Sequence, residues 1–184
     1  NFKEIMLNTF VVHVENKPGV LTRVASLFRR RAFNIDSLTV GRTEKPEVSR
    51  MTITAEADFD QARRIEANLY KLVNVLLVEN ITNEPAMTRD LAMIKVAATH
   101  EARSHVLELA NVFRGRVVDV APESLTIEIT GAEDKIDGLL EVLRPYGVIE
   151  MVRTGIVAMR RGAKSAADTA SGPHALAQIA GDEN

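Results

Sequence analysis

The feature that most constrains the fold of this chain is one pattern of apolar spacing that occurs twice. In the first copy, Val12 and Val14 alternate with Val11 and His13 across residues 7–14, and a period of two is typical of a strand. From Val20 to about residue 31 the apolar residues follow a helical spacing instead. The other elements predicted for this copy are strands at 33–42, 48–57 and 73–81 and a helix at 62–72.

The second copy repeats the same order of elements after a short polar stretch. Gly115 is expected to end its first helix as a C-terminal glycine, and Pro145 to end its second. Strand, helix, strand, strand, helix, strand is the order of the ferredoxin-like fold. We therefore predict an α+β protein built from two ferredoxin-like βαββαβ domains. The elements predicted for this copy are strands at 91–98, 117–120, 125–130 and 148–152, an extension at 155–159, and helices at 101–113 and 136–143.

These repeats divide the chain into four parts. The predicted parts are a first domain at 5–82, a linker at 83–87, a second domain at 88–162 and a tail at 163–184. The tail is rich in Ala, Ser, Gly and Asp and offers little apolar area, which predicts a flexible segment. An Ala-rich helix that docks on a partner is the alternative for the tail.

Composition excludes several classes of protein and site. The formal net charge is −2, without the basic excess of a nucleic-acid binder. The chain has no cysteine, so disulfides, thiolate metal sites and a cysteine nucleophile are excluded. Its four histidines are dispersed, which predicts no metal site. No run approaches the ~20 apolar residues of a membrane span, and no signal peptide is recognisable.

No catalytic constellation is visible either. The chain carries no glycine-rich phosphate loop and no compact set of acid, base and nucleophile. An RNA-recognition module shares the βαββαβ order, but its central strands carry aromatic residues on which bases stack. Here those strands carry Val12, Val14, Met51 and Ile53. We therefore expect a chain without catalytic chemistry of its own.

The segment 15–21, Glu-Asn-Lys-Pro-Gly-Val-Leu, connects the first strand to the first helix. Backbone N–H groups at a helix start lack partners within the helix, and together with the helix dipole they favour a carboxylate. Gly19 would allow close approach, and the Asn16 amide offers both a donor and an acceptor. A purely structural strand–helix turn explains the same residues, and turn chemistry alone favours that interpretation.

A second candidate segment joins the first helix to the second strand. Asn34 could hydrogen-bond an ammonium or a carboxylate through its amide, or could simply be a left-handed residue that caps the helix. The residues do not decide between these two roles.

Longer runs resemble one protein family. Asn16-x-Pro18-Gly19-Val20-Leu21 in a βαββαβ unit is similar to the ACT domain, a module that binds amino acids. The family resembled over about residues 5–162 is the small regulatory subunit of acetolactate synthase, also called acetohydroxyacid synthase. One departure is Ala32, where the family usually has glycine; a positive φ there would cost about 1 kcal/mol. The runs that carry the resemblance are 33–41, 49–53, 71–75, 89–96, 113–115 and 153–159.

The resemblance implies an allosteric regulator that senses valine. It implies that two N-terminal domains pair in a homodimer or a higher homo-oligomer. Valine would bind at their interface, with Asn34 and Ile35 contributed by the other protomer. Such a subunit would activate a catalytic large subunit and confer feedback inhibition in the biosynthesis of valine, leucine and isoleucine. The valine-binding residues that the resemblance implies are Asn16, Lys17, Pro18, Gly19, Val20, Leu21, Asn34 and Ile35.

The resemblance also implies where the chemistry takes place. Thiamine diphosphate, Mg²⁺ and FAD would belong to the catalytic partner, and this chain would need no cofactor. We expect a bacterial, cytoplasmic protein, although an organelle is an alternative source. Another ACT-domain regulator that responds to an amino acid is the alternative function. The sequence leaves open whether a metal ion assists the dimer and what the second domain does.

Overall fold

The computed structural model describes residues 4–162, so the predicted tail at 163–184 lies outside the described residues. The chain divides into two compact units. The first contains the described residues up to Met87 and those from Ala158 onward, and the second is Thr88–Val157. No helix within residues 4–162 is long and apolar enough to cross a membrane.

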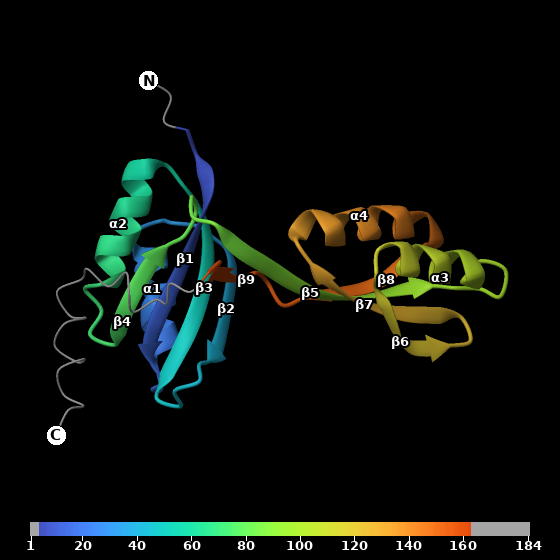
Figure 1. The fold of residues 1–184 in the computed structure, drawn as a ribbon, viewed down its shortest axis with the longest axis horizontal. Coiled ribbons are helices and arrows are strands. Elements are labelled where there is room, and N and C mark those ends of the chain that lie inside the picture. Colours follow the sequence, from blue (N-terminus) through green and yellow to red (C-terminus); the bar gives the residue numbers. More distant parts are fainter. Residues whose placement is uncertain (1–3, 163–184) are drawn as a thin grey trace. The chain divides into compact units, whose positions relative to one another are not determined.

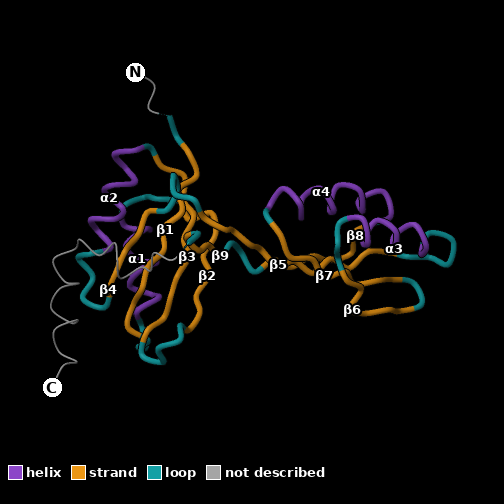
Figure 2. The backbone as a smooth tube through the Cα atoms, in the orientation of Figure 1, coloured by secondary structure: helices purple, strands orange, loops and turns teal. Residues whose placement is uncertain are grey.

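The first unit is a four-stranded antiparallel sheet with two helices (Figures 1 and 2). The strand order is β2-β3-β1-β4, so β2 and β4 are the two edges. In the register, His13 of β1 lies between Arg50 of β3 and Leu77 of β4. The elements are β1 (Met6–Glu15), α1 (Val20–Arg30), β2 (Ile35–Arg42), β3 (Val48–Ala57), α2 (Phe59–Leu69) and β4 (Val75–Asn80).

The second unit repeats this arrangement. Its strand order is β6-β7-β5-β8, in which each strand occupies the place of its counterpart in the first unit. The predicted α+β class and the two βαββαβ units are therefore confirmed. The elements are β5 (Ala86–Ala97), α3 (Arg103–Val112), β6 (Arg116–Ala121), β7 (Ser124–Gly131), α4 (Glu133–Leu143), a 3₁₀ turn (Arg144–Tyr146) and β8 (Val148–Arg153). One further strand, β9 (Val157–Arg160), follows them in the chain.

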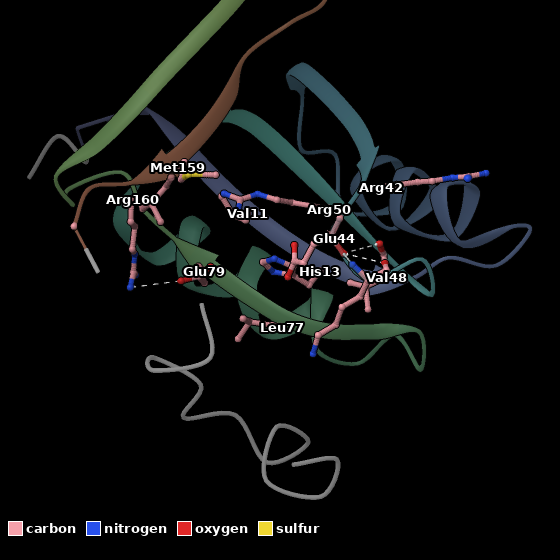
Figure 3. Close-up of a pocket in the computed structure, with 14 residues that line it drawn as sticks. Val11, His13, Arg42, Glu44, Val48, Arg50, Leu77, Glu79, Met159 and Arg160 are labelled. Carbon is pink, nitrogen blue, oxygen red and sulfur yellow. Dashed lines mark hydrogen bonds and ion pairs between the residues drawn. The ribbon is translucent and has the colours of Figure 1, made fainter. Parts of the chain in front are cut away.

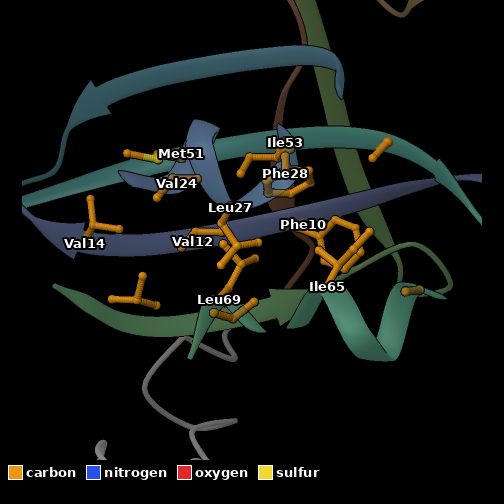
Figure 4. Packing of buried hydrophobic residues seen from close by; sticks show 14 of the residues in the cluster. Phe10, Val12, Val14, Val24, Leu27, Phe28, Met51, Ile53, Ile65 and Leu69 are labelled. Carbon is orange, nitrogen blue, oxygen red and sulfur yellow. The ribbon is translucent and has the colours of Figure 1, made fainter. Parts of the chain in front are cut away.

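Both helices of the first unit pack on one face of its sheet (Figure 4). Phe10 of β1 is fully buried there, together with Phe28 of α1 and Ile65 of α2. Burial of a large apolar side chain contributes about 1.5–3 kcal/mol each, so this layer is the main source of stability. The period-two and helical spacings of the sequence therefore identify the buried faces correctly.

The ends of the helices follow local rules. α2 begins at Phe59, three residues before the predicted start, because Asp58 and Gln61 form a reciprocal capping box. After α1, the N–H of Phe33 donates to the Phe28 carbonyl at 3.1 Å and that of Ala32 to the Arg29 carbonyl at 3.1 Å. This is a Schellman motif, and the edge-on contact between the Phe28 and Phe33 rings completes it.

The role predicted for Gly115 was wrong. α3 ends in the same motif, but the left-handed residue is Arg114, with φ 57°, while Gly115 follows it. A Cβ on Gly115 would lie 2.9 Å from Ile127 Cγ2, so glycine is needed there for close packing against β7. The helix ends where the sequence predicted, but for a different reason.

The strand β9 also differs from its prediction. Residues 155–159 were expected to extend the last strand of the second domain, but β9 is a separate strand that pairs with β5. From Ala158 onward the described residues belong to the first unit, and the second unit is Thr88–Val157. Ala158 is buried with Val11 and Ile81 on the sheet face that the helices leave bare.

Candidate functional site

The start of α1 has the features expected of an anion site. Gly19 is the N-cap residue with φ 83°, a left-handed conformation that L side chains adopt only with strain. Among the described residues no side chain caps this helix, and its first turn holds no acidic residue. Within residues 4–162, the backbone N–H groups of Leu21 and Thr22 have no hydrogen-bond acceptor. Unpaired N–H groups and the positive end of the dipole therefore point out of this helix end.

Asn16 is held by the turn between β2 and β3. Its backbone N–H donates to the Glu47 carbonyl at 2.7 Å, and its Nδ2 donates to the Pro46 carbonyl at 2.9 Å. These two bonds fix the side-chain amide and leave Oδ1 as the group available to a ligand. An amide oxygen is an acceptor, so it suits an ammonium group. Asn16, Lys17, Pro18 and Gly19 are all exposed.

A polar bridge connects the two ends of this loop. Asn74, which directly precedes β4, donates from Nδ2 to Glu15 Oε2 at 2.5 Å. The guanidinium of Arg23 in α1 donates to Oδ1 of the same amide. The hydrogen bonds from Asn74 and Lys17 lower the pKa of Glu15, so this carboxylate is charged at neutral pH. Asn74 was not among the predicted site residues; an asparagine directly before an apolar strand is the sequence signal that could have identified it.

The second predicted segment lies at the far end of α1. Asn34 is exposed, and Ile35 is half-buried against the core of the first unit. α1 has 11 residues, which at 1.5 Å per residue separates the two segments by roughly 16 Å. One chain therefore does not bring Asn16–Leu21 together with Asn34–Ile35.

Ala32 has a positive φ, although the family usually has glycine at this position. Its φ is 55°, in the left-handed region that favours glycine. Ala32 occupies the turn immediately before Asn34. The strain therefore lies beside the second predicted segment.

A cavity of about 660 Å³ opens on the bare face of the first unit's sheet (Figure 3). Burial and the charge of Arg50 lower the pKa of His13 in this cavity, while Glu79 and Glu44 oppose the shift. Arg160 of β9 lies 3.5 Å from Glu79. His13 was not among the predicted site residues, because it is one of four dispersed histidines in the sequence. The cavity lining carries more basic than acidic side chains, so its net charge is positive. The basic residues are Arg42, Lys45, Arg50 and Arg160, and the acidic ones are Glu44 and Glu79.

The described residues provide no obvious metal site. Nowhere in residues 4–162 do three His, Asp or Glu side chains gather closely enough to hold an ion. The helix start of the second unit also differs from that of the first. Arg103 donates to the carbonyls of Ala98, Ala121 and Pro122 there, at 3.2, 2.8 and 2.5 Å.

Comparison with known proteins identifies both units. Residues 10–77 match the family model of the acetohydroxyacid synthase small subunit-like ACT domain. Residues 89–162 match the model of the small subunit of acetolactate synthase. The predicted resemblance is therefore confirmed over both halves of the chain.

Individual relatives agree with the family models. A probable acetolactate synthase small subunit of Archaeoglobus fulgidus is 50% identical over 159 residues, covering 86% of this chain and 99% of that protein. The acetolactate synthase small subunit of Mycobacterium bovis is 48% identical over 155 residues, covering 84% and 92%. The crystal structure of the acetolactate synthase small subunit from Thermotoga maritima superposes with a TM-score of 0.81 at 40% identity, covering 86% and 99%. The chain belongs to the family of acetolactate synthase small subunits, the regulatory chains whose name implies a catalytic large-subunit partner.

Proposed function

We propose that this chain binds valine at the start of α1. The observation that carries the proposal is the uncapped helix start at Gly19, with unpaired N–H groups at Leu21 and Thr22 and no acid in the first turn. The valine carboxylate accepts hydrogen bonds from these N–H groups. Its ammonium group donates to Oδ1 of Asn16, whose Nδ2 is already bonded to Pro46.

A second copy of the chain completes the site. Asn34 and Ile35 lie at the opposite end of α1 from Gly19, so two chains related by a two-fold axis can place one segment against the other. Such an arrangement contains two equivalent valine sites. The exposed edge strand β2 is available for pairing between the copies.

The apolar side chains at the two half-sites favour a branched aliphatic ligand. Leu21 is 44% exposed, and Ile35 is half-buried. Between them a valine side chain is enclosed, whereas an additional methylene changes binding by ~1–3 kcal/mol. We therefore expect valine to bind more tightly than leucine or isoleucine.

Regulation follows from a ligand that bridges two chains. Valine binds more tightly to the chain arrangement in which both half-sites meet, and this difference in affinity can shift the state of an attached enzyme. In this proposal the chain activates the catalytic large subunit, and valine reverses that activation as feedback inhibition. Carbon–carbon bond formation, with its thiamine diphosphate, Mg²⁺ and FAD, belongs to the partner.

Calorimetry tests the valine site. Wild-type protein should release or absorb heat on titration with valine, and Asn34→Ala should bind at least about tenfold more weakly, the equivalent of ~1.4 kcal/mol. Asn111→Ala, a change at an exposed asparagine of the second unit, serves as the matched control and should bind normally. Absence of heat and of competition at millimolar valine would reject the site.

A reconstitution experiment tests regulation separately. The chain is mixed with a catalytic large subunit, and acetolactate production is measured with and without valine. The expected result is a higher rate without valine and loss of that increase with it. An unchanged rate in both conditions would rule out the activating role.

A further inference from the structure

The polar bridge formed by Glu15, Asn74 and Arg23 lies beside the proposed valine site and gives Asn74 a role there. The side chain of Asn74 contacts the residue before the loop and a residue in the first turns of the helix after it. Nδ2 donates to Glu15, and Oδ1 accepts from Arg23. The Asn74 backbone carbonyl also accepts from the Glu15 N–H at 2.9 Å. The segment 16–19 is therefore closed at both ends by a single residue.

An amide suits this place because of the charges on either side. Glu15 is an anion that needs a donor, and Arg23 is a cation that needs an acceptor. Asparagine offers one of each on a short side chain, whereas alanine offers neither. Asn74 is only 9% exposed, so water does not readily replace these bonds.

We propose that Asn74 is a positioning residue for the valine site, holding the loop at 16–19 at a fixed distance from the N–H groups of α1. This inference rests on the proposed valine binding and extends it to a third segment of the chain. The residues of the loop are exposed, and among residues 4–162 its other bonds are local. Asn16 is bonded to the turn at Glu47 and Pro46, and the N–H of Lys17 donates to the Glu15 carbonyl at 2.9 Å. Loss of the bridge lets the ligand's carboxylate and ammonium partners move apart, and binding weakens as geometry is lost.

Asn68 provides a matched control for loss of a buried amide. It is 8% exposed, and its Nδ2 donates to the Arg64 carbonyl at 2.7 Å within α2, away from the loop. Asn68→Ala therefore removes a comparable buried hydrogen bond from the same unit. Comparing the two variants separates a weaker site from a less stable domain.

The experiment measures valine affinity by calorimetry and unfolding by urea for the full chain. Asn74→Ala should bind valine about tenfold more weakly, while Asn68→Ala binds as wild type despite a similar loss of stability. Asn74→Asp keeps the acceptor for Arg23 but places a second carboxylate against Glu15, so it should bind valine no more tightly than Asn74→Ala. In Asn74→Ala the pKa of Glu15, followed by NMR, should rise toward its ordinary value.

The outcomes separate this inference from the function on which it rests. If the wild type binds valine and the affinity of Asn74→Ala is within twofold of the wild-type affinity, the positioning role is overturned. The proposed valine site then remains intact. Equal weakening in Asn68→Ala and Asn74→Ala shows a general loss of stability and also overturns the role. Wild-type protein that does not bind valine overturns both.

Discussion

Replacement of Ala32 by glycine should stabilise the first unit. Ala32 has φ 55° and is exposed, so it carries the strain of a left-handed residue without compensating packing. That strain is about 1–2 kcal/mol for an L-residue. Glycine removes this strain, but it also raises the conformational entropy of the unfolded chain, which lowers the stability by roughly 0.4–1 kcal/mol. The net gain is then ~0.8 kcal/mol, which corresponds to a rise in Tm of roughly 3–6 °C for a domain of this size.

The measurement must resolve the two units, because each has its own core. Hydrogen exchange at increasing urea concentration, read peptide by peptide by mass spectrometry, gives the free energy of unfolding of each unit. Arg114→Gly is the matched control, since Arg114 has φ 57° in the equivalent motif after α3. It should stabilise the second unit by a similar amount. A lower stability of Ala32→Gly would refute the argument from backbone strain.

Three further predictions test other parts of the first unit. Gly19→Ala should destabilise the first unit by about 1–2 kcal/mol and weaken valine binding. The cause is the φ of 83°, because a Cβ there would meet no atom within 4 Å. Urea unfolding measures the loss of stability, and calorimetry measures the loss of valine affinity. Stability of the wild type should decrease as pH falls below 6.5, because burial and Arg50 lower the pKa of His13 and the folded chain favours neutral imidazole. His13→Gln should flatten this pH dependence, and an unchanged slope would contradict the assignment. Arg160→Ala removes the ion pair with Glu79 and should speed hydrogen exchange in β9 while exchange in α3 stays constant.

Most of the architecture could be predicted because the strands and helices follow local periodic patterns of apolar residues. Alternation along β1 and β3 reports which residues face the helices, since a strand turns its side chains to opposite faces at every residue. The elements that differed from prediction depend on contacts between distant residues. β9 belongs with the first unit because Ala158 packs against Val11, and no local pattern in residues 155–159 signals that contact.

The sequence by itself determined the repeated βαββαβ order, the absence of cysteine chemistry and, through its ordered runs, the family. It also located both candidate ligand segments, because a strand–helix turn with Pro18 and Gly19 is a local signal. Only the tertiary structure decided that these segments lie at opposite ends of α1, that Asn74 joins the two sides of the loop, and that Arg114 rather than Gly115 is left-handed. The physical reason is that periodicity and turn chemistry act over a few residues, whereas hydrogen bonds such as that between Glu15 and Asn74 join residues 59 positions apart.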